Sequence, residues 1–148
     1  GRIYVSSRGN YYGTGSDIYV IDAATEKVIG NLGIAASEMC IDDDRLYTIS
    51  TEWSYTSSSN EVSYAVYDTA EQRIVSHNFI TDGTEKEISL PYGLAVNPET
   101  KEIFVCDATN YVTPGYLYCF TPEGTLKWKV RTGDIPAHIA FSSEPYYY

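Results

Sequence analysis

Residues with the chemistry of an active site are few in this sequence and stand far apart. There are two histidines, His77 and His138, and three cysteines at irregular spacing. The cysteines lack the CxxC spacing of a zinc site. The glycine-containing segment 13–16 is not followed by the lysine or the helix start that a phosphate loop needs. We therefore predict no catalytic residue, no metal ion and no cofactor.

One pair of titratable residues has side chains suited to acid–base chemistry. Glu38 and His138 occupy the same position in two copies of a repeated segment. We expect this segment to line the central channel of a ring of repeats, so both side chains would lie on the channel wall. A carboxylate and an imidazole can carry out acid–base chemistry, bind a metal or form a hydrogen-bonded pair. One of each is too few for a metal site. We expect a solvated pair on the channel wall.

Two further groups of residues have simple interpretations. Asp42-Asp43-Asp44 is acidic enough for calcium but lacks the spaced ligands and the bidentate glutamate of a calcium loop, so we expect a solvated turn. Cys106 and Cys119 fall in strands expected to be neighbours. A disulfide between them is one interpretation, and buried free thiols are the favoured one.

Aromatic residues provide a stronger candidate for a binding site. The 148 residues include 15 tyrosines, and many lie in three loops, 10–15, 53–60 and 110–114, among Ser, Asn and Gly. Rigid aromatic rings with small polar neighbours are typical of recognition surfaces, and stacking on sugar rings is one use of them. These loops could equally be connectors whose tyrosines pack on their own sheet. The candidate ligand-binding residues are Tyr11, Tyr12, Trp53, Tyr55, Asn110 and Tyr111.

Charge excludes one class of partner, and hydropathy excludes a membrane-spanning segment in this sequence. The formal net charge is −10, with only ten basic residues scattered along the chain. Binding to a phosphate backbone needs clustered Lys and Arg, so we expect no nucleic acid. No apolar run approaches the roughly 18 residues of a membrane-spanning segment. The chain starts directly before a predicted strand, and we expect it to be part of something longer, with any signal or lipid anchor upstream.

A four-part pattern occurs three times and predicts the fold. Its first part joins a charged, an aliphatic, an aromatic and a β-branched residue, as in Arg2-Ile3-Tyr4-Val5. The four sets of equivalent segments are 2–7, 45–50 and 102–107; 17–22, 63–68 and 116–121; 27–29, 73–75 and 126–128; and 37–41, 92–96 and 137–141. Ile3 and Leu46 are 43 positions apart, and Leu46 and Ile103 are 57 apart. Short strands at such periods, without a helical period, predict an all-β chain of about three four-stranded antiparallel β-propeller blades.

The order of the segments defines the blade boundaries. Blade 1 covers 1–33 and is closed by 136–141, blade 2 covers 34–80, and blade 3 covers 90–133, all in one propeller segment. The strand around Ile139 should complete the sheet begun by Ile3. Three blades are fewer than the usual four to eight. The chain is therefore either a fragment of a larger propeller, the favoured alternative, or half of a six-bladed ring built from two copies.

The repeated motifs resemble a known family. Ile3-Tyr4-Val5, Lys27-Val28-Ile29 and residues 91–98 (Pro-Tyr-Gly-Leu-Ala-Val-Asn-Pro) are similar to the YVTN-type repeats of surface-layer-like propellers. The Tyr- and Ser-rich loops resemble those of exported propeller proteins of Bacteroidetes. Asp42-Asp43-Asp44 departs from the pattern, which has Asn-Pro in this turn. The resemblance implies an extracytoplasmic protein, periplasmic or at the cell surface, without assigned catalysis.

Three functions remain open at this point. The favoured one is a non-catalytic scaffold of the cell envelope that binds a small molecule, a carbohydrate or a protein. Self-association and tethering to the membrane by an upstream lipid anchor are compatible with it. The second is a part of a propeller enzyme, a lyase, hydrolase or quinone-dependent dehydrogenase, completed by other blades. The third is a purely structural surface-layer or adhesin repeat.

Overall fold

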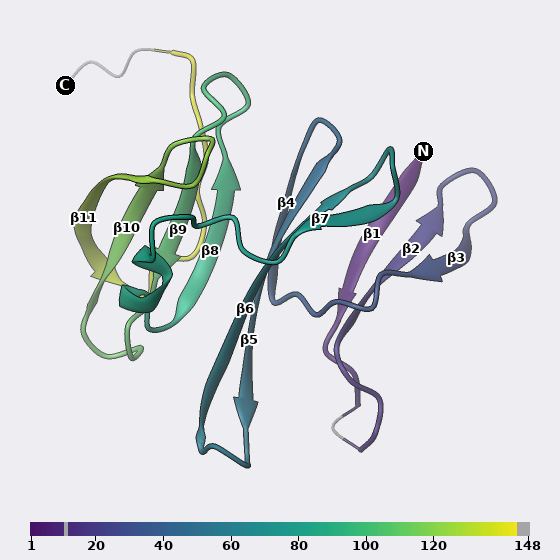
Figure 1. The fold of residues 1–148 in the computed structure, drawn as a ribbon, viewed down its shortest axis with the longest axis horizontal. Coiled ribbons are helices and arrows are strands. Elements are labelled where there is room, and N and C mark those ends of the chain that lie inside the picture. Colours follow the sequence, from purple (N-terminus) through teal and green to yellow (C-terminus); the bar gives the residue numbers. More distant parts are fainter. Residues whose placement is uncertain (11, 145–148) are drawn as a thin grey trace. The chain divides into compact units, whose positions relative to one another are not determined.

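A computed structural model describes residues 1–10 and 12–144, and shows an all-β chain (Figure 1). Its strands form three antiparallel sheets, of three, four and four strands, as the alternation of apolar residues predicts. One short helical turn, η1 (Thr84–Glu87), occurs among the described residues. No helix in this part of the chain has the length and apolar character required to cross a membrane.

Each sheet is a meander in which consecutive strands are neighbours. Sheet A has the order β1 (Arg2–Ser7), β2 (Asp17–Asp22), β3 (Lys27–Asn31). Sheet B has the order β4 (Glu38–Asp42), β5 (Arg45–Ser54), β6 (Ser59–Asp68), β7 (Arg73–Ser76). Sheet C has the order β8 (Pro91–Val96), β9 (Ile103–Asp107), β10 (Pro114–Phe120), β11 (Leu126–Asp134).

The described residues form two compact units. Unit 1 comprises residues 1–39 and 44–78, and therefore holds sheet A with most of sheet B. Unit 2 comprises residues 40–43 and the chain from residue 79 onward, and holds sheet C. Each unit has its own buried core and is described separately.

The core of unit 1 lies between sheets A and B. Ile18 and Leu46 are fully buried there together with Ala36 and Tyr67. The Tyr4 ring meets the Tyr67 ring edge-on, with 6.3 Å between centroids. Such aromatic pairs contribute about 0.5–1.5 kcal/mol beyond the area they bury. Alternate residues of β1 and β2 thus hold sheet A against sheet B.

The core of unit 2 is built from the middle strands of sheet C. Ile103 and Val105 on β9 and Phe120 on β10 are shielded from solvent. The Tyr118 and Phe120 rings are nearly parallel, with centroids 6.2 Å apart. Because β9 and β10 have neighbours on both edges, they carry the most deeply buried side chains of this unit.

Short polar side chains close tight turns between strands in both units. The Asp22 carboxylate accepts hydrogen bonds from the backbone N–H groups of Ala24 and Thr25, at 3.0 and 2.7 Å. Asp68 and Asn97 bind the N–H groups two and three residues ahead of them in the same manner. A side-chain oxygen that fixes a turn in this way also fixes the register of the strands that it joins.

The segment 136–141, for which the sequence predicts a strand, forms none in the structure. It runs over the face of sheet C that carries Phe104, where the Phe141 ring lies 5.3 Å from the Phe104 ring. Gly93 permits this approach, since a Cβ there would collide with the Ala137 carbonyl oxygen. A strand needs a free backbone edge beside it, and the face of a sheet offers only side chains. Sheet A therefore has three strands instead of the expected four, and its closure by 136–141 stays a prediction.

Replacing Gly124 by alanine should destabilise unit 2 by about 2 kcal/mol or more. Gly124 has φ 89°, in the left-handed region, and a Cβ there would collide with the Phe79 carbonyl oxygen. Gly133→Ala is the matched control, because a Cβ at Gly133 meets no atom within 4 Å. Urea denaturation of both variants measures the difference. Equal stability of G124A and G133A would contradict the packing of this turn.

The free energy of unfolding should fall as the pH drops below about 4. Backbone hydrogen bonds from Thr25, Glu71 and Leu126 hold the carboxyl pKa of Asp22, Asp68 and Asp82 below its usual value. Groups with a lower pKa in the folded state stabilise the fold above their unfolded pKa and lose that contribution as they take up protons. Denaturant titrations between neutral pH and about pH 3 measure this loss. Asp68→Asn should show a shallower decline, and a decline as steep as that of the wild type would contradict the role of Asp68.

Candidate functional site

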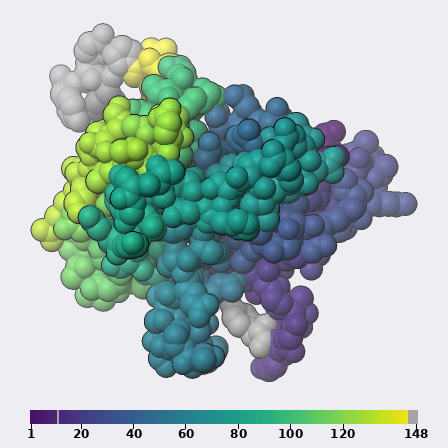
Figure 2. Space-filling view, in the orientation of Figure 1, coloured from purple at the N-terminus to yellow at the C-terminus, as the bar shows by residue number. Residues whose placement is uncertain are grey.

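The hairpin of β5 and β6 presents two of the predicted aromatic residues. Both strands are ten residues long, and Trp53 pairs with Asn60 while Ser54 pairs with Ser59. Trp53 therefore lies in a strand, and the expected loop 53–60 is wrong in extent: the strands continue to within four residues of each other. The Trp53 side chain is 55 % exposed and that of Tyr55 is 88 % exposed. In the space-filling view the hairpin tip is a protruding knob (Figure 2).

The β1–β2 loop provides a third aromatic residue at the same end of unit 1 (Figure 1). Tyr12 is 95 % exposed. The loop is shaped by Asn10, whose side-chain oxygen accepts hydrogen bonds from the backbone N–H groups of Tyr12 and Thr14, at 2.9 and 3.0 Å. Tyr11, the other candidate in this loop, lies outside the described residues. The structure thus places Tyr12, Trp53 and Tyr55 on two neighbouring projections of one unit.

The third predicted loop belongs to unit 2 and has a different character. The side-chain oxygen of Asn110 accepts hydrogen bonds from the backbone N–H of Val112 and from the N–H and hydroxyl of Thr113. Asn110 therefore shapes the loop. Tyr111 has φ 64° and packs edge-on against Tyr92, with 5.4 Å between ring centroids. About half of its side chain remains exposed on unit 2.

The two residues of the predicted channel wall lie in different units. Glu38 is half-buried at the start of β4, in unit 1. His138 is exposed in the segment that crosses sheet C, in unit 2. Their pairing on one wall stays a prediction.

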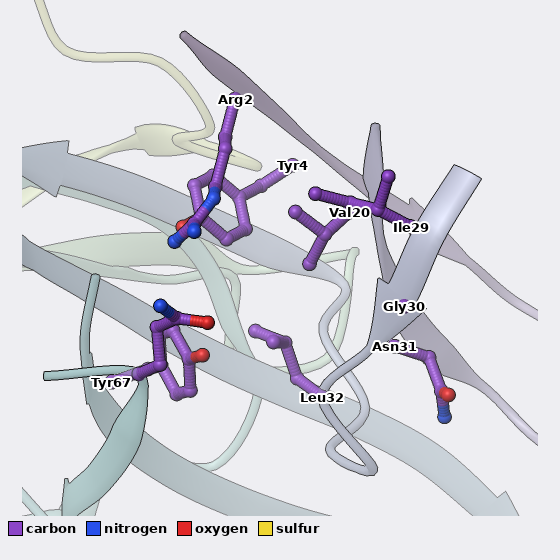
Figure 3. A pocket seen from close by; sticks show the side chains of 9 residues that line it. Arg2, Tyr4, Val20, Ile29, Gly30, Asn31, Leu32 and Tyr67 are labelled. Atoms are coloured by element: carbon purple, nitrogen blue, oxygen red, sulfur yellow. The ribbon is translucent and has the colours of Figure 1, made fainter. Parts of the chain in front are cut away.

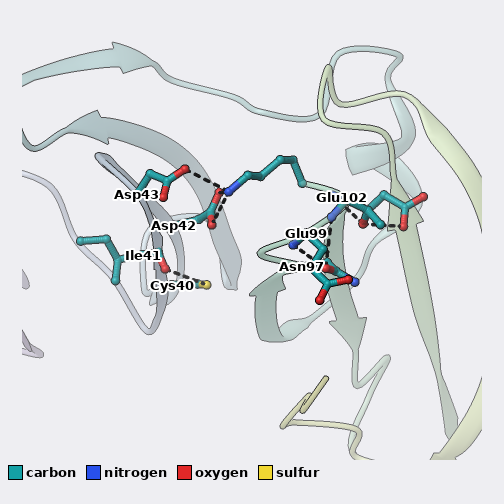
Figure 4. Close-up of polar contacts among 9 residues, drawn as sticks. Cys40, Ile41, Asp42, Asp43, Asn97, Glu99 and Glu102 are labelled. Carbon is teal, nitrogen blue, oxygen red and sulfur yellow. Dashed lines mark hydrogen bonds and ion pairs between the residues drawn. The ribbon is translucent and has the colours of Figure 1, made fainter. Parts of the chain in front are cut away.

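The acidic turn after β4 is compensated by a lysine that the sequence analysis did not consider. Lys101 Nζ lies 3.0 Å from a carboxylate oxygen of Asp42 and 3.0 Å from one of Asp43, as Figure 4 shows. These two aspartates and Lys101 all belong to unit 2. Their hydrogen bonds to the ammonium raise the pKa of Lys101. No group of three or more metal-binding side chains occurs among the described residues.

The cysteines are free thiols in the structure. Cys106 and Cys119 are buried in sheet C on neighbouring strands, but Cys106 pairs with Leu117 and Cys119 pairs with Phe104. The two sulfur-bearing residues are thus offset by two positions along β10. Burial raises the pKa of the Cys119 thiol, which keeps it protonated and unreactive.

A recess in unit 1 was not foreseen from the sequence. Its cavity volume is about 110 Å³, and Arg2, Tyr4 and Tyr67 line it together with Asn31 and Leu32 (Figure 3). Arg2 donates a hydrogen bond of 3.4 Å to the Thr69 carbonyl. The recess lies between sheets A and B, and residues of β3 and of the β6–β7 turn are among those that line it. It has room for a few water molecules at most.

Comparison with protein-family models and with curated proteins finds no match to this chain.

Replacing Lys101 by methionine should lower the melting temperature at low salt by several degrees, because Asp42 and Asp43 are then left to repel each other. The difference from the wild type should shrink at about 1 M NaCl, where the screening length is only about 3 Å. Lys27→Met, at an exposed lysine on β3, is the control for loss of one positive charge. Thermal melts at both salt concentrations test this, and a loss that salt does not reduce would contradict the electrostatic role.

Proposed function

We propose that the three sheets are blades of a β-propeller. Sheets B and C are four-stranded meanders built from equivalent segments, and sheet A repeats three of the four strands. Sheets A and B pack face to face in unit 1 through the residues around Ile18 and Leu46. Face-to-face packing of successive meanders is the way in which propeller blades bury their apolar side chains.

Within this fold we propose an exported, non-catalytic binding module of the cell envelope. The observation that carries this function is the exposure of Tyr12, Trp53 and Tyr55 on two projections at the same end of unit 1. A ligand that covers these aromatic side chains would gain about 25 cal/mol of binding free energy for each Å² of apolar surface removed from water. The extracytoplasmic location is supported by the resemblance of the repeats to surface-layer-like propellers.

The hairpin presents its aromatic residues on a rigid support. Strand pairing continues to Ser54 and Ser59, so the backbone beneath Trp53 is held before a ligand arrives. A preorganised surface loses less conformational entropy on binding than a mobile loop. Ser and Thr residues stand next to Trp53 and Tyr55 in the sequence of the hairpin tip and offer hydrogen bonds.

A carbohydrate fits this surface best among the ligand classes expected from the sequence. Sugar rings have apolar faces for the aromatic side chains and hydroxyl groups for the polar ones. The net charge of −10 disfavours polyanions. A protein ligand would need an area larger than a few aromatic side chains, since stable protein interfaces bury about 800 Å² on each partner.

Titration of intrinsic tryptophan fluorescence tests this function directly. The chain has two tryptophans, so Trp128→Phe leaves Trp53 as the only indole and the hairpin tip as the only reporter. Soluble hexasaccharides of β-glucan, α-glucan and chitin are the probes. We expect a saturable change in Trp53 emission with at least one of them, and an affinity about tenfold weaker in a Tyr55→Ala variant, equal to about 1.4 kcal/mol.

The control for this titration is Glu71→Ala, at the exposed turn that follows the far end of β6. E71A should bind as the parent does. Absence of a saturable signal with every sugar, or equal binding by the Tyr55→Ala variant, would contradict carbohydrate binding at the hairpin tip.

A further inference from the structure

Equivalent positions of the repeat differ sharply in exposure, and the difference is confined to sheet A. Ile3 on β1 corresponds to Leu46 on β5 and Ile103 on β9. Leu46 is 2 % exposed and Ile103 is 1 % exposed, whereas Ile3 is 50 % exposed. Two residues further along the same strands, Thr48 and Val105 are 1 % and 0 % exposed, whereas Val5 is 41 % exposed. In sheets B and C these positions are covered.

The uncovered positions form one continuous face of sheet A. Ile3 pairs with Ile21, and Ile21 pairs with Val28, whose side chain is largely exposed. Residues that pair across antiparallel strands lie on the same face of the sheet. Tyr4, Ile18 and Val20 point the other way, towards the core and the recess of unit 1. A row of β-branched residues thus faces away from sheet B.

The edge of sheet A is uncovered as well. In sheet C, the strand β8 lies beside β9, with Leu94 opposite Val105 and Val96 opposite Ile103. In sheet A, β1 is an edge strand within the described part of the chain. An exposed, apolar edge strand is a template for the addition of another strand.

The segment that matches this edge is present at the other end of the same chain. Ile139 and Phe141 have the positions in the repeat that Leu94 and Val96 have on β8. These residues form no strand in unit 2, although their apolar alternation is that of one. Beside them on the outer face of sheet C, Trp128 and Val130 on β11 are about half exposed. The described residues therefore combine an edge strand, β1, that lacks the partner its counterpart β9 has in β8, a strand-like segment outside any sheet, and an apolar surface next to each.

We propose that residues 137–141 of one copy add as a strand to the β1 edge of a second copy. The outer face of sheet C of the first copy then covers the exposed face of sheet A of the second copy. The register of β8 on β9 then places Ile139 opposite Val5 and Phe141 opposite Ile3 of the other copy. Each copy donates one segment and receives one, so the β1 edge of both copies is paired.

A second copy is favoured over the other occupants for two reasons. Pairing within one chain would close a ring of three sheets, below the four to eight of known propellers, whereas two copies supply six. Both halves of the contact, the β1 edge and the segment 137–141, are present on this chain. The interface is separate from the aromatic end of unit 1, and its failure would leave the proposed binding function untouched.

Disulfide trapping between two single variants tests the pairing. Val5→Cys and Ile139→Cys, each in a Cys40→Ser background, are purified with different tags, mixed and oxidised. Neither side chain is buried, so each variant should keep its fold. We expect a covalent product that contains both tags and has about twice the 16.5 kDa mass of one chain. Light scattering of the untreated wild type should give the same doubled mass.

Val28→Cys mixed with Ile139→Cys is the matched control, because Val28 is an exposed valine of the same sheet but lies on β3, at the edge opposite β1. It should give little product. The double variant V5C/I139C in one chain distinguishes the two forms of closure, since a disulfide within a monomer would show pairing inside one chain. That result, a monomeric wild type, or equal trapping by V5C and V28C would overturn the proposal.

Discussion

Apolar side chains alternate with others along the strands of this chain, and the buried ones on each sheet must be kept from water by a neighbouring layer. In unit 1 the constraint is met between sheets A and B, where Ile18 and Leu46 are buried and Tyr4 meets Tyr67. In unit 2 it is met around Ile103 and Phe120. Because a single meander buries little on its own, the stability of every sheet depends on its neighbour.

The turns convert this packing into defined positions for the loops. Asp22 and Asp68 bind the backbone of the turns that follow β2 and β6, and so fix how far each strand extends. Asp68 fixes one end of β6, and the hairpin tip lies at the other end of this ten-residue strand. The direction of Trp53 and Tyr55 thus follows from the core and from one carboxylate rather than from contacts of the tip itself.

Strands and sheet order were predictable from the sequence because they depend on local alternation and on the repeat. The length of the β5–β6 hairpin was not, since residues 51–62 are mostly polar, lie in solvent on both faces and lack the apolar alternation that indicates a strand. The bond of Lys101 to Asp42 and Asp43 joins residues 58 and 59 positions apart, which no local pattern records. The path of 136–141 depends on Gly93, whose missing side chain has meaning only once the two segments meet.

Pairing of the β1 edge with a second copy would also affect the loop of unit 1 that holds Tyr12. β1 continues into the loop that holds Tyr12, and among the described residues β1 is paired on one side only, with β2. A strand with one neighbour has half the backbone hydrogen bonds of a central strand, and its end frays more readily. Addition of a strand to this edge would hold β1 on both sides and with it the start of the loop at Ser7. Assembly through sheet A would therefore stiffen one of the two projections that present aromatic rings, without any contact to the rings themselves.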